Sequence, residues 1–180
     1  TGRRRVAVRW LLLLGLILAY WPTQLAAQGS NQAALVVRFD DGSVQTRCVT
    51  FDEAQITGYE LLLRAGLDVT ADVQGAGALI CAINDTGCAA DNCLCHCAGG
   101  DDCRYWSYWL QNEGQWHYAQ GGASMVSVRP GMVQGWSWGP GSVDDAVAPP
   151  ALTFDAVCAA DATAVPANTT AQTETPLAPT

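Results

Sequence analysis

The sequence predicts an α+β fold: a mixed sheet packed on one helix, with a disulfide-rich loop inserted between two strands and a disordered C-terminal tail. Three observations support this prediction. Short runs rich in β-branched and aromatic residues recur between positions 34 and 138, and one capped helical segment follows the second run. Six of the eight cysteines lie between Cys81 and Cys103. From Gly139 onward, proline recurs among alanine and threonine, a composition that buries too little apolar surface to fold.

The N-terminal segment, residues 1–27, has the layout of a secretory signal peptide. Four arginines come first, an apolar run from Trp10 to about Trp21 follows, and Ala26 and Ala27 offer a cleavage point. The apolar run is short for a transmembrane helix, which needs roughly 20 residues. We therefore expect cleavage near Ala27 and a final location outside the cell or in the cell envelope. An uncleaved membrane anchor is the alternative, and it would be the protein's contact with a membrane.

The cysteines favour a disulfide framework. Exported proteins meet an oxidising environment, and an even number of cysteines there indicates disulfides. The Cys-x-Cys-x-Cys spacing at Cys93–Cys97 also differs from the usual spacing of zinc ligands. We expect all eight to be paired and none to bind a metal, with a metal-binding Cys/His loop around His96 as the alternative. The predicted disulfide cysteines are Cys48, Cys81, Cys88, Cys93, Cys95, Cys97, Cys103 and Cys158.

The pairing is constrained but not determined by the sequence. Cys158 stands alone in the tail, so its partner should be Cys48 or another cysteine of the folded core. The other loop cysteines should pair mostly among themselves. Cys93 and Cys95 should not bridge to each other, because two residues on one strand face do not readily meet disulfide geometry.

The charge balance argues against a nucleic-acid partner. The chain has 9 Lys and Arg residues against 17 Asp and Glu residues. Since four arginines belong to the N-terminal segment, the remainder carries a net charge of −12. Phosphate backbones require the opposite sign.

A hairpin and a helix open the predicted domain. Ala34–Phe39 and Val44–Phe51 read as strands joined by an Asp-Gly turn at Asp41. Thr57 and Glu60 then form a capping-box pattern. Gly66 should end the helix. The apolar stripe expected to face the sheet comprises Ile56, Tyr59, Leu62 and Leu63.

Further strands follow the helix. Six runs have the length and composition of strands, and a cysteine-rich loop at 84–104 separates the second from the third. These runs are Leu67–Val69, Leu79–Ile83, Tyr105–Asn112 with its return Gln115–Ala119, Met125–Val128 and Val133–Trp138. The folded domain should occupy residues 34–141, and the tail 142–180, pinned at Cys158.

Two strands, one helix and then more strands with a late aromatic hairpin is the order of a β-grasp domain. The segments "ITGYELLLRAGLDV", "LICAIND", "YWSYWLQNEGQWHYAQGGAS" and "VSVRPGMVQGWSWGPG" resemble the transcobalamin C-terminal-like (DUF4430-type) family. They are more closely similar to exported, cysteine-rich bacterial proteins with such a module. The resemblance covers about residues 34–141. It implies a β-grasp fold and allows a cobalamin-type ligand, because transcobalamin-like members contact a corrinoid with this domain. The cysteine-rich loop is a departure from the family pattern. No other cofactor is expected.

The aromatic strands supply the predicted binding face. Side chains alternate along a strand, so Tyr105 and Trp109 face one side while Trp106 and Tyr108 face the other. One helix covers one side only, which should leave an aromatic row open to ligands. The predicted ligand-binding residues are Tyr105, Trp109, Trp116, Trp136 and Trp138. At least two of Trp109, Trp136 and Trp138 should be substantially exposed, near the cysteine loop. The alternative is that the loop and tail bury them.

Enzymatic motifs are weak. His96 and His117 are the two histidines, and no Gly-x-Ser-x-Gly elbow occurs. The sequence therefore predicts an exported, non-catalytic binding module whose partner is a small molecule or a protein. A structural cell-envelope protein with a disulfide-stapled core is the alternative.

Overall fold

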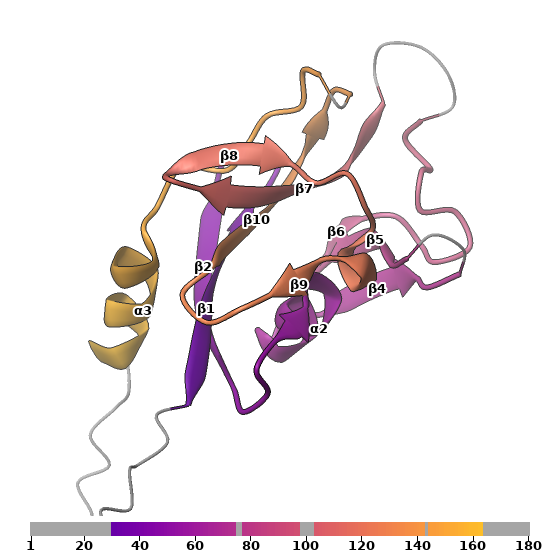
Figure 1. Cartoon of the computed structure of the whole chain (residues 1–180). Helices are drawn as coiled ribbons and strands as arrows, with labels where there is room; N and C mark the ends of the chain where they lie inside the picture. The colour runs from indigo at the N-terminus through magenta and orange to yellow at the C-terminus, as the bar shows by residue number, and fades with distance from the viewer. Residues whose placement is uncertain (1–29, 75–76, 98–102, 143, 164–180) are drawn as a thin grey trace, which may run out of the picture.

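The computed structural model describes residues 30–74, 77–97, 103–142 and 144–163, and a five-stranded sheet lies at its centre (Figure 1). The strand order is β2-β1-β10-β7-β8. The strands are β1 (Asn31–Arg38), β2 (Val44–Phe51), β10 (Val133–Pro140), β7 (Arg104–Asn112) and β8 (Gln115–Tyr118). β1 pairs with β10 in parallel, and the other pairs are antiparallel. The predicted α+β class with a β-grasp-like mixed sheet is thereby confirmed.

Two smaller sheets flank the central one. β3 (Ile56–Thr57) pairs with β9 (Ser127–Val128), and β4 (Val69–Asp72), β5 (Leu79–Ile83) and β6 (Thr86–Gly87) form a three-stranded sheet. The strand predicted at Met125–Val128 was partly wrong, because a 3-10 turn, η2 (Ala123–Met125), occupies its start. The strand expected at Leu67–Val69 lies instead at β4, where it pairs with β5.

The helix α2 (Gly58–Arg64) begins where the capping box predicts. The Thr57 Oγ1 accepts the Glu60 backbone N–H at 3.1 Å, and the Thr57 N–H donates to Glu60 Oε2 at 2.7 Å. The predicted stripe was wrong at Leu63, which is 45% exposed. The buried positions are Gly58, Leu61, Leu62 and Ala65, which follow helical spacing once the two small residues are included.

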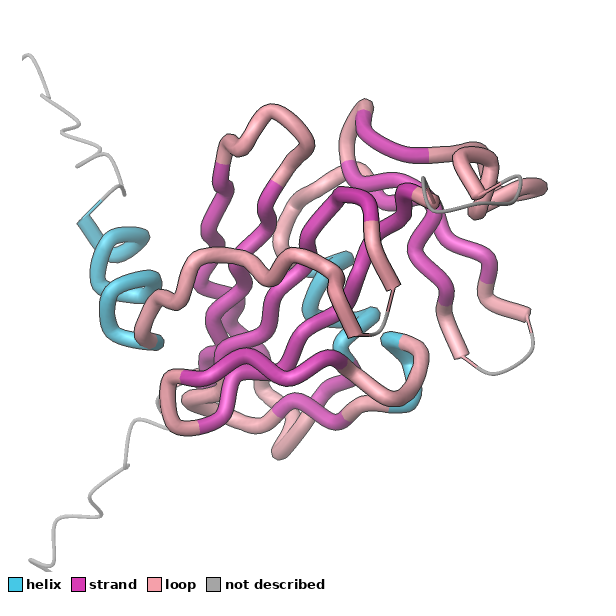
Figure 2. Tube along the Cα trace, turned by 90° about the horizontal axis from the view of Figure 1, so that it is seen from above, coloured by secondary structure: helices cyan, strands magenta, loops and turns pink. Residues whose placement is uncertain are grey.

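Both faces of the sheet are covered. On one face, α2 and the smaller sheets enclose a core that includes Leu35, Trp106 and Trp136. On the other face, α3 (Phe154–Thr163) packs on β1 and β2, with Val157 against the cluster of Ala34 and Val36. Figures 1 and 2 show α2 and α3 on opposite sides of these strands. The expectation of a disordered tail from residue 142 was therefore wrong for 154–163.

The disulfides agree with the predicted pattern. Cys48 pairs with Cys158 across a sequence separation of 110 and joins β2 to α3. The six cysteines of the loop region pair among themselves. Their bridges are Cys81–Cys93, Cys88–Cys95 and Cys97–Cys103.

The predicted signal segment, 1–27, and the end of the tail, 164–180, lie outside the described residues. Within the described ranges, no helix is both long and apolar enough to cross a membrane.

Candidate functional site

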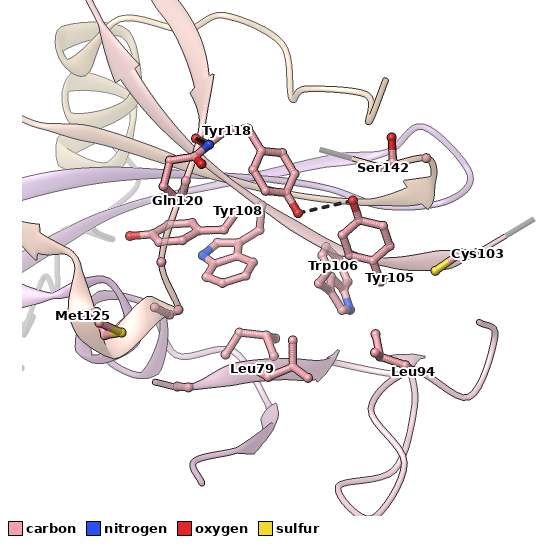
Figure 3. A pocket seen from close by; sticks show the side chains of 18 of the residues that line it. Leu79, Leu94, Cys103, Tyr105, Trp106, Tyr108, Tyr118, Gln120, Met125 and Ser142 are labelled. Carbon is pink, nitrogen blue, oxygen red and sulfur yellow. Dashed lines mark hydrogen bonds between the residues drawn. The ribbon is translucent and has the colours of Figure 1, made fainter. Parts of the chain in front are cut away.

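A cavity of about 950 Å³ lies between the first half of β7 and the opposing β5, η2 and cysteine loop. Aromatic and apolar side chains dominate its wall, and a few polar groups lie among them (Figure 3). The lining residues are Ala78, Leu79, Ile80, Leu94, Cys103, Tyr105, Trp106, Tyr108, Tyr118, Ala119, Gln120, Gly121, Gly122, Ala123, Met125, Trp136, Gly141, Ser142 and Asp145.

The strand pairing explains why this cavity exists. β8 pairs with β7 only at positions 109–112, so the earlier part of β7 has no neighbour from β8 in the ladder. After β8, the chain bends away toward η2, held by the Ala119 N–H donating to the Tyr108 carbonyl at 2.9 Å. Side chains from both faces of β7 therefore reach the same space. Tyr105 belongs to one face, and Trp106 and Tyr108 belong to the other.

One wall of the cavity is a rigid aromatic stack. The rings of Tyr108 and Trp136 lie parallel, with centroids 4.3 Å apart. The Tyr108 hydroxyl donates to Gln134 Oε1. Burial raises the pKa of Tyr108, although the hydrogen bond with Gln134 opposes that shift. The hydroxyl also lies against Gly58, where a Cβ would overlap it.

Trp136 contributes an unsatisfied polar group to this wall. It is 3% exposed, and its indole N–H finds no hydrogen-bond partner among the described residues. A buried donor without a partner costs about 1–3 kcal/mol.

A pair of tyrosine hydroxyls forms the opposite part of the cavity. The Tyr118 hydroxyl donates to the Tyr105 hydroxyl at 3.3 Å (Figure 3). Burial raises the pKa of Tyr105, with smaller contributions from Tyr118 and from the charge of Asp145. Tyr105 therefore remains neutral at physiological pH.

Asp145 is the carboxylate of the described lining. Ser142 holds it in place: its hydroxyl donates to Asp145 Oδ1 at 2.6 Å, and its backbone N–H donates to the same oxygen. These hydrogen bonds lower the pKa of Asp145, because they stabilise the charged form. The sequence reading placed this segment in the tail and so did not include it in the site.

Three large apolar side chains at the cavity are exposed. Leu79, Leu94 and Met125 are 40%, 46% and 65% exposed. They come from β5, the cysteine loop and η2, which lie far apart in the sequence (Figure 3). Sequence reasoning missed them, since a single exposed apolar residue gives no signal by itself.

The predicted exposed tryptophan platform was wrong. Trp109, Trp136 and Trp138 are 8%, 3% and 4% exposed. Of the five predicted ligand-binding residues, Tyr105 and Trp136 line the cavity, while Trp109, Trp116 and Trp138 do not.

Specific neighbours bury the tryptophans. His96 of the cysteine loop covers the edge of Trp138 with ring centroids 5.9 Å apart. Tyr118 packs edge-on against Trp109, whose N–H donates to Ser107 Oγ at 2.8 Å. Trp116 is half-buried and packs beside Gly135. The cysteine loop, β8 and the α3 segment thus cover surfaces that a single helix leaves open.

The cysteine loop also brings a histidine close to two sulfurs. One ligand atom from each of Cys88, Cys95 and His96 lies within 4.8 Å of the others. Cys88 and Cys95 form a disulfide, so neither sulfur is a thiolate in this state. Reduction would leave two thiolates and an imidazole together, which are ligands that suit zinc.

Comparison with known proteins gives a match to a family model and a similarity to solved structures. Residues 98–171 match the model of the SCO2322-like domain, a stretch that includes β7, β10 and α3. The chain is also similar in fold to a crystal structure described as a "putative metal binding protein" from Ruminococcus gnavus ATCC 29149. That similarity has 16% identity and a TM-score of 0.45, and covers 62% of this chain and 99% of the other. No curated protein matches this chain.

Proposed function

We propose that this protein is an exported, non-catalytic module that binds a small ligand in the aromatic cavity beside β7. The observation that carries the proposal is the cavity itself. Its volume of about 950 Å³ lies within the usual range for ligand pockets, roughly 300–1,000 Å³. Apolar and aromatic walls with a few fixed polar groups are typical of such pockets.

The exposed apolar rim of the cavity supports ligand binding over simple packing. Leu79, Leu94 and Met125 expose apolar surface at one place, which proteins tend to keep for binding. A ligand would cover this exposed apolar surface.

The chemistry of the lining supports contact rather than catalysis. Cys103 is held in a disulfide with Cys97, so it offers no thiolate. The Asp145 carboxylate is hydrogen-bonded by Ser142 within its own turn. A nucleophile with an adjacent base is what covalent catalysis needs, and the described lining consists mainly of aromatic and aliphatic groups.

Export is part of the same proposal. Four disulfides tie the described chain together, and such bonds persist in oxidising compartments. We place the protein in the cell envelope or outside the cell, in agreement with the sequence of residues 1–27.

A blocking substitution at the rim of the cavity tests the proposal. The oxidised protein is titrated with a panel of small molecules that includes cobalamin, which the transcobalamin-like resemblance suggests first, and intrinsic tryptophan fluorescence is followed. Leu79→Arg adds bulk at an exposed lining position and should abolish binding. Leu63→Arg, on the exposed side of α2, is the matched control and should bind normally.

The alternative is that the aromatic residues have a structural role only. The same experiment distinguishes this role from ligand binding. If no member of the panel binds, and Leu79→Arg behaves as the wild type does in every assay, the aromatic residues serve only as core.

The Cys88, Cys95 and His96 cluster favours a second candidate function, metal binding by the reduced loop. Under reducing conditions the protein should bind zinc, measured by elemental analysis after gel filtration. His96→Ala should weaken this binding. His117→Ala, an exposed histidine on β8, should not. Equal zinc binding by both variants would rule out the Cys88, Cys95 and His96 cluster as the zinc site.

A further inference from the structure

We infer that the ligand of the cavity is an organic cation: an ammonium group, primary or quaternary, on an apolar body. The inference rests on the proposed function and specifies its ligand class. The cation would lie at Asp145, Tyr105 and Tyr118, and the apolar body would lie against Trp136 and Leu79.

The charges around the cavity are of one sign. Asp145 lines it, and no basic side chain appears in the described lining. The nearest basic residue in sequence is Arg104, one residue before Tyr105, but its guanidinium pairs with Asp40 in the β1–β2 turn. Asp145 thus lines the cavity as an exposed carboxylate with no basic partner among the described ion pairs.

The carboxylate is fixed in this position. Ser142 donates two hydrogen bonds to Oδ1 of Asp145, which fixes that oxygen and favours the ionised form. Oδ2 receives no described hydrogen bond. Ser142 and Gly141 also line the cavity.

Aromatic rings near a carboxylate are the surroundings that a cation prefers. Ring faces attract cations through their quadrupole, and alkylated ammonium groups are recognised by such aromatic surroundings. Tyr105 and Tyr118 meet at their hydroxyls, and the charge of Asp145 acts on Tyr105. Neutral ligands would use the aromatic wall equally well, but they would gain nothing from the Asp145 carboxylate, which is exposed and stays hydrated beside them.

The net charge of the chain has the same sign as Asp145 and also favours a cationic ligand. Beyond residue 27 it is −12, and this field attracts cations and repels anions during association. An anionic ligand would be repelled by the negative net charge of the chain and by the Asp145 carboxylate.

The test compares three probes of similar size on the oxidised full chain: phenyltrimethylammonium, its neutral carbon isostere tert-butylbenzene, and benzenesulfonate. Affinities are measured by tryptophan fluorescence. We expect the cation to bind at least about tenfold more tightly than the neutral isostere. An interaction with a charged group typically contributes this much to affinity. The anion should bind most weakly.

Two substitutions with the same change in net charge assign the effect to one carboxylate. Asp145→Asn keeps the acceptor for Ser142 and should remove the preference for the cation, while affinity for tert-butylbenzene stays within about twofold. Asp144→Asn, the adjacent exposed aspartate outside the lining, should leave the preference intact.

The outcomes separate this inference from the proposed function. Binding of the neutral isostere as tight as that of the cation, or equal effects of the two substitutions, would overturn the inference and leave the cavity as a ligand site. If no probe binds and the ligand panel also fails, both are overturned.

Discussion

At the scale of single residues, Gly58 shows how closely α2 approaches the sheet. A Cβ at this position would overlap the Tyr108 hydroxyl and lie 3.0 Å from Gln134 Oε1. Those two groups hydrogen-bond to each other beneath the helix, and Tyr108 stacks on Trp136. The absence of a side chain at Gly58 therefore sets the position of one wall of the cavity.

Gly58→Ala should lower the free energy of unfolding by about 1–3 kcal/mol, the usual cost of overpacking a core. Urea denaturation of the oxidised protein measures this change. Gly139→Ala is the control, since a Cβ there meets nothing within 4 Å; its effect should stay within about 0.5 kcal/mol. An alanine at position 58 that leaves stability unchanged would contradict the packing described.

At the scale of elements, an ion pair ties α2 to the loop that precedes β3. Arg64 donates to both carboxylate oxygens of Glu53, at 2.8 and 2.9 Å. The hydrogen bond from Arg64 is the main cause that lowers the pKa of Glu53 from its ordinary value of 4.5 to about 2. Because the folded state holds the lower pKa, this stabilisation is present above pH 4.5 and is lost as the pH falls toward 2.

Glu53→Gln should therefore reduce the acid sensitivity of the fold. Between pH 4.5 and about 2, the free energy of unfolding should fall less steeply in the variant than in the wild type. Urea denaturation at a series of pH values measures both slopes. The pair is exposed, so about 1 M salt should shrink the difference. Parallel slopes at low salt would mean that the pair does not stabilise the fold.

The elements whose signals are local could be predicted from the sequence. The Asp-Gly hairpin, the capping box at Thr57 and the strand Leu79–Ile83 each depend on neighbouring residues, and each lies where expected. β9 and α3 could not be predicted in the same way. β9 has two residues and exists through its pairing with β3. α3 is weakly amphipathic and is anchored by Cys158 and Val157 on a sheet formed much earlier in the chain.

At the scale of the whole molecule, the segment after β10 completes the fold. It crosses the face of the sheet opposite α2, where Pro149 packs against Gly135 beside Trp116. The Cys48–Cys158 disulfide holds its end. The sequence predicted an aromatic row that stays open, with burial under the loop and tail as the alternative, and the structure supports the alternative.

Removal of the Cys48–Cys158 disulfide should loosen the packing of the α3 segment on the sheet. Cys48→Ala with Cys158→Ala should cost about 2–4 kcal/mol of stability, and acrylamide should then quench more tryptophan fluorescence as Trp116, which packs in the α3 cluster, becomes more accessible. Cys97→Ala with Cys103→Ala is the control pair. It opens a loop with a sequence separation of only 6, and neither cysteine belongs to β2 or α3. Quenching that rises equally in both variants would contradict a specific role for α3.

The candidate site illustrates what a linear pattern leaves undetermined. Alternation correctly placed Tyr105 and Trp109 on one face of β7. Exposure, however, depends on segments that meet only in three dimensions: His96 over Trp138, and Leu79 opposite Tyr105 across the cavity. The pocket arises because β8 ends early, and no residue type signals that ending.

The bond between Cys48 and Cys158 also has a mechanical consequence. Tension applied from the start of β1 to the end of α3 would reach Cys48, cross to Cys158 through the sulfurs, and leave the intervening chain unloaded. The bridged stretch spans 110 positions, roughly 360–400 Å of contour when fully extended. The cavity lies wholly within it. Stretching could strip β1 and the start of β2 from the sheet, yet the bridged segment could not lengthen while the bond is intact.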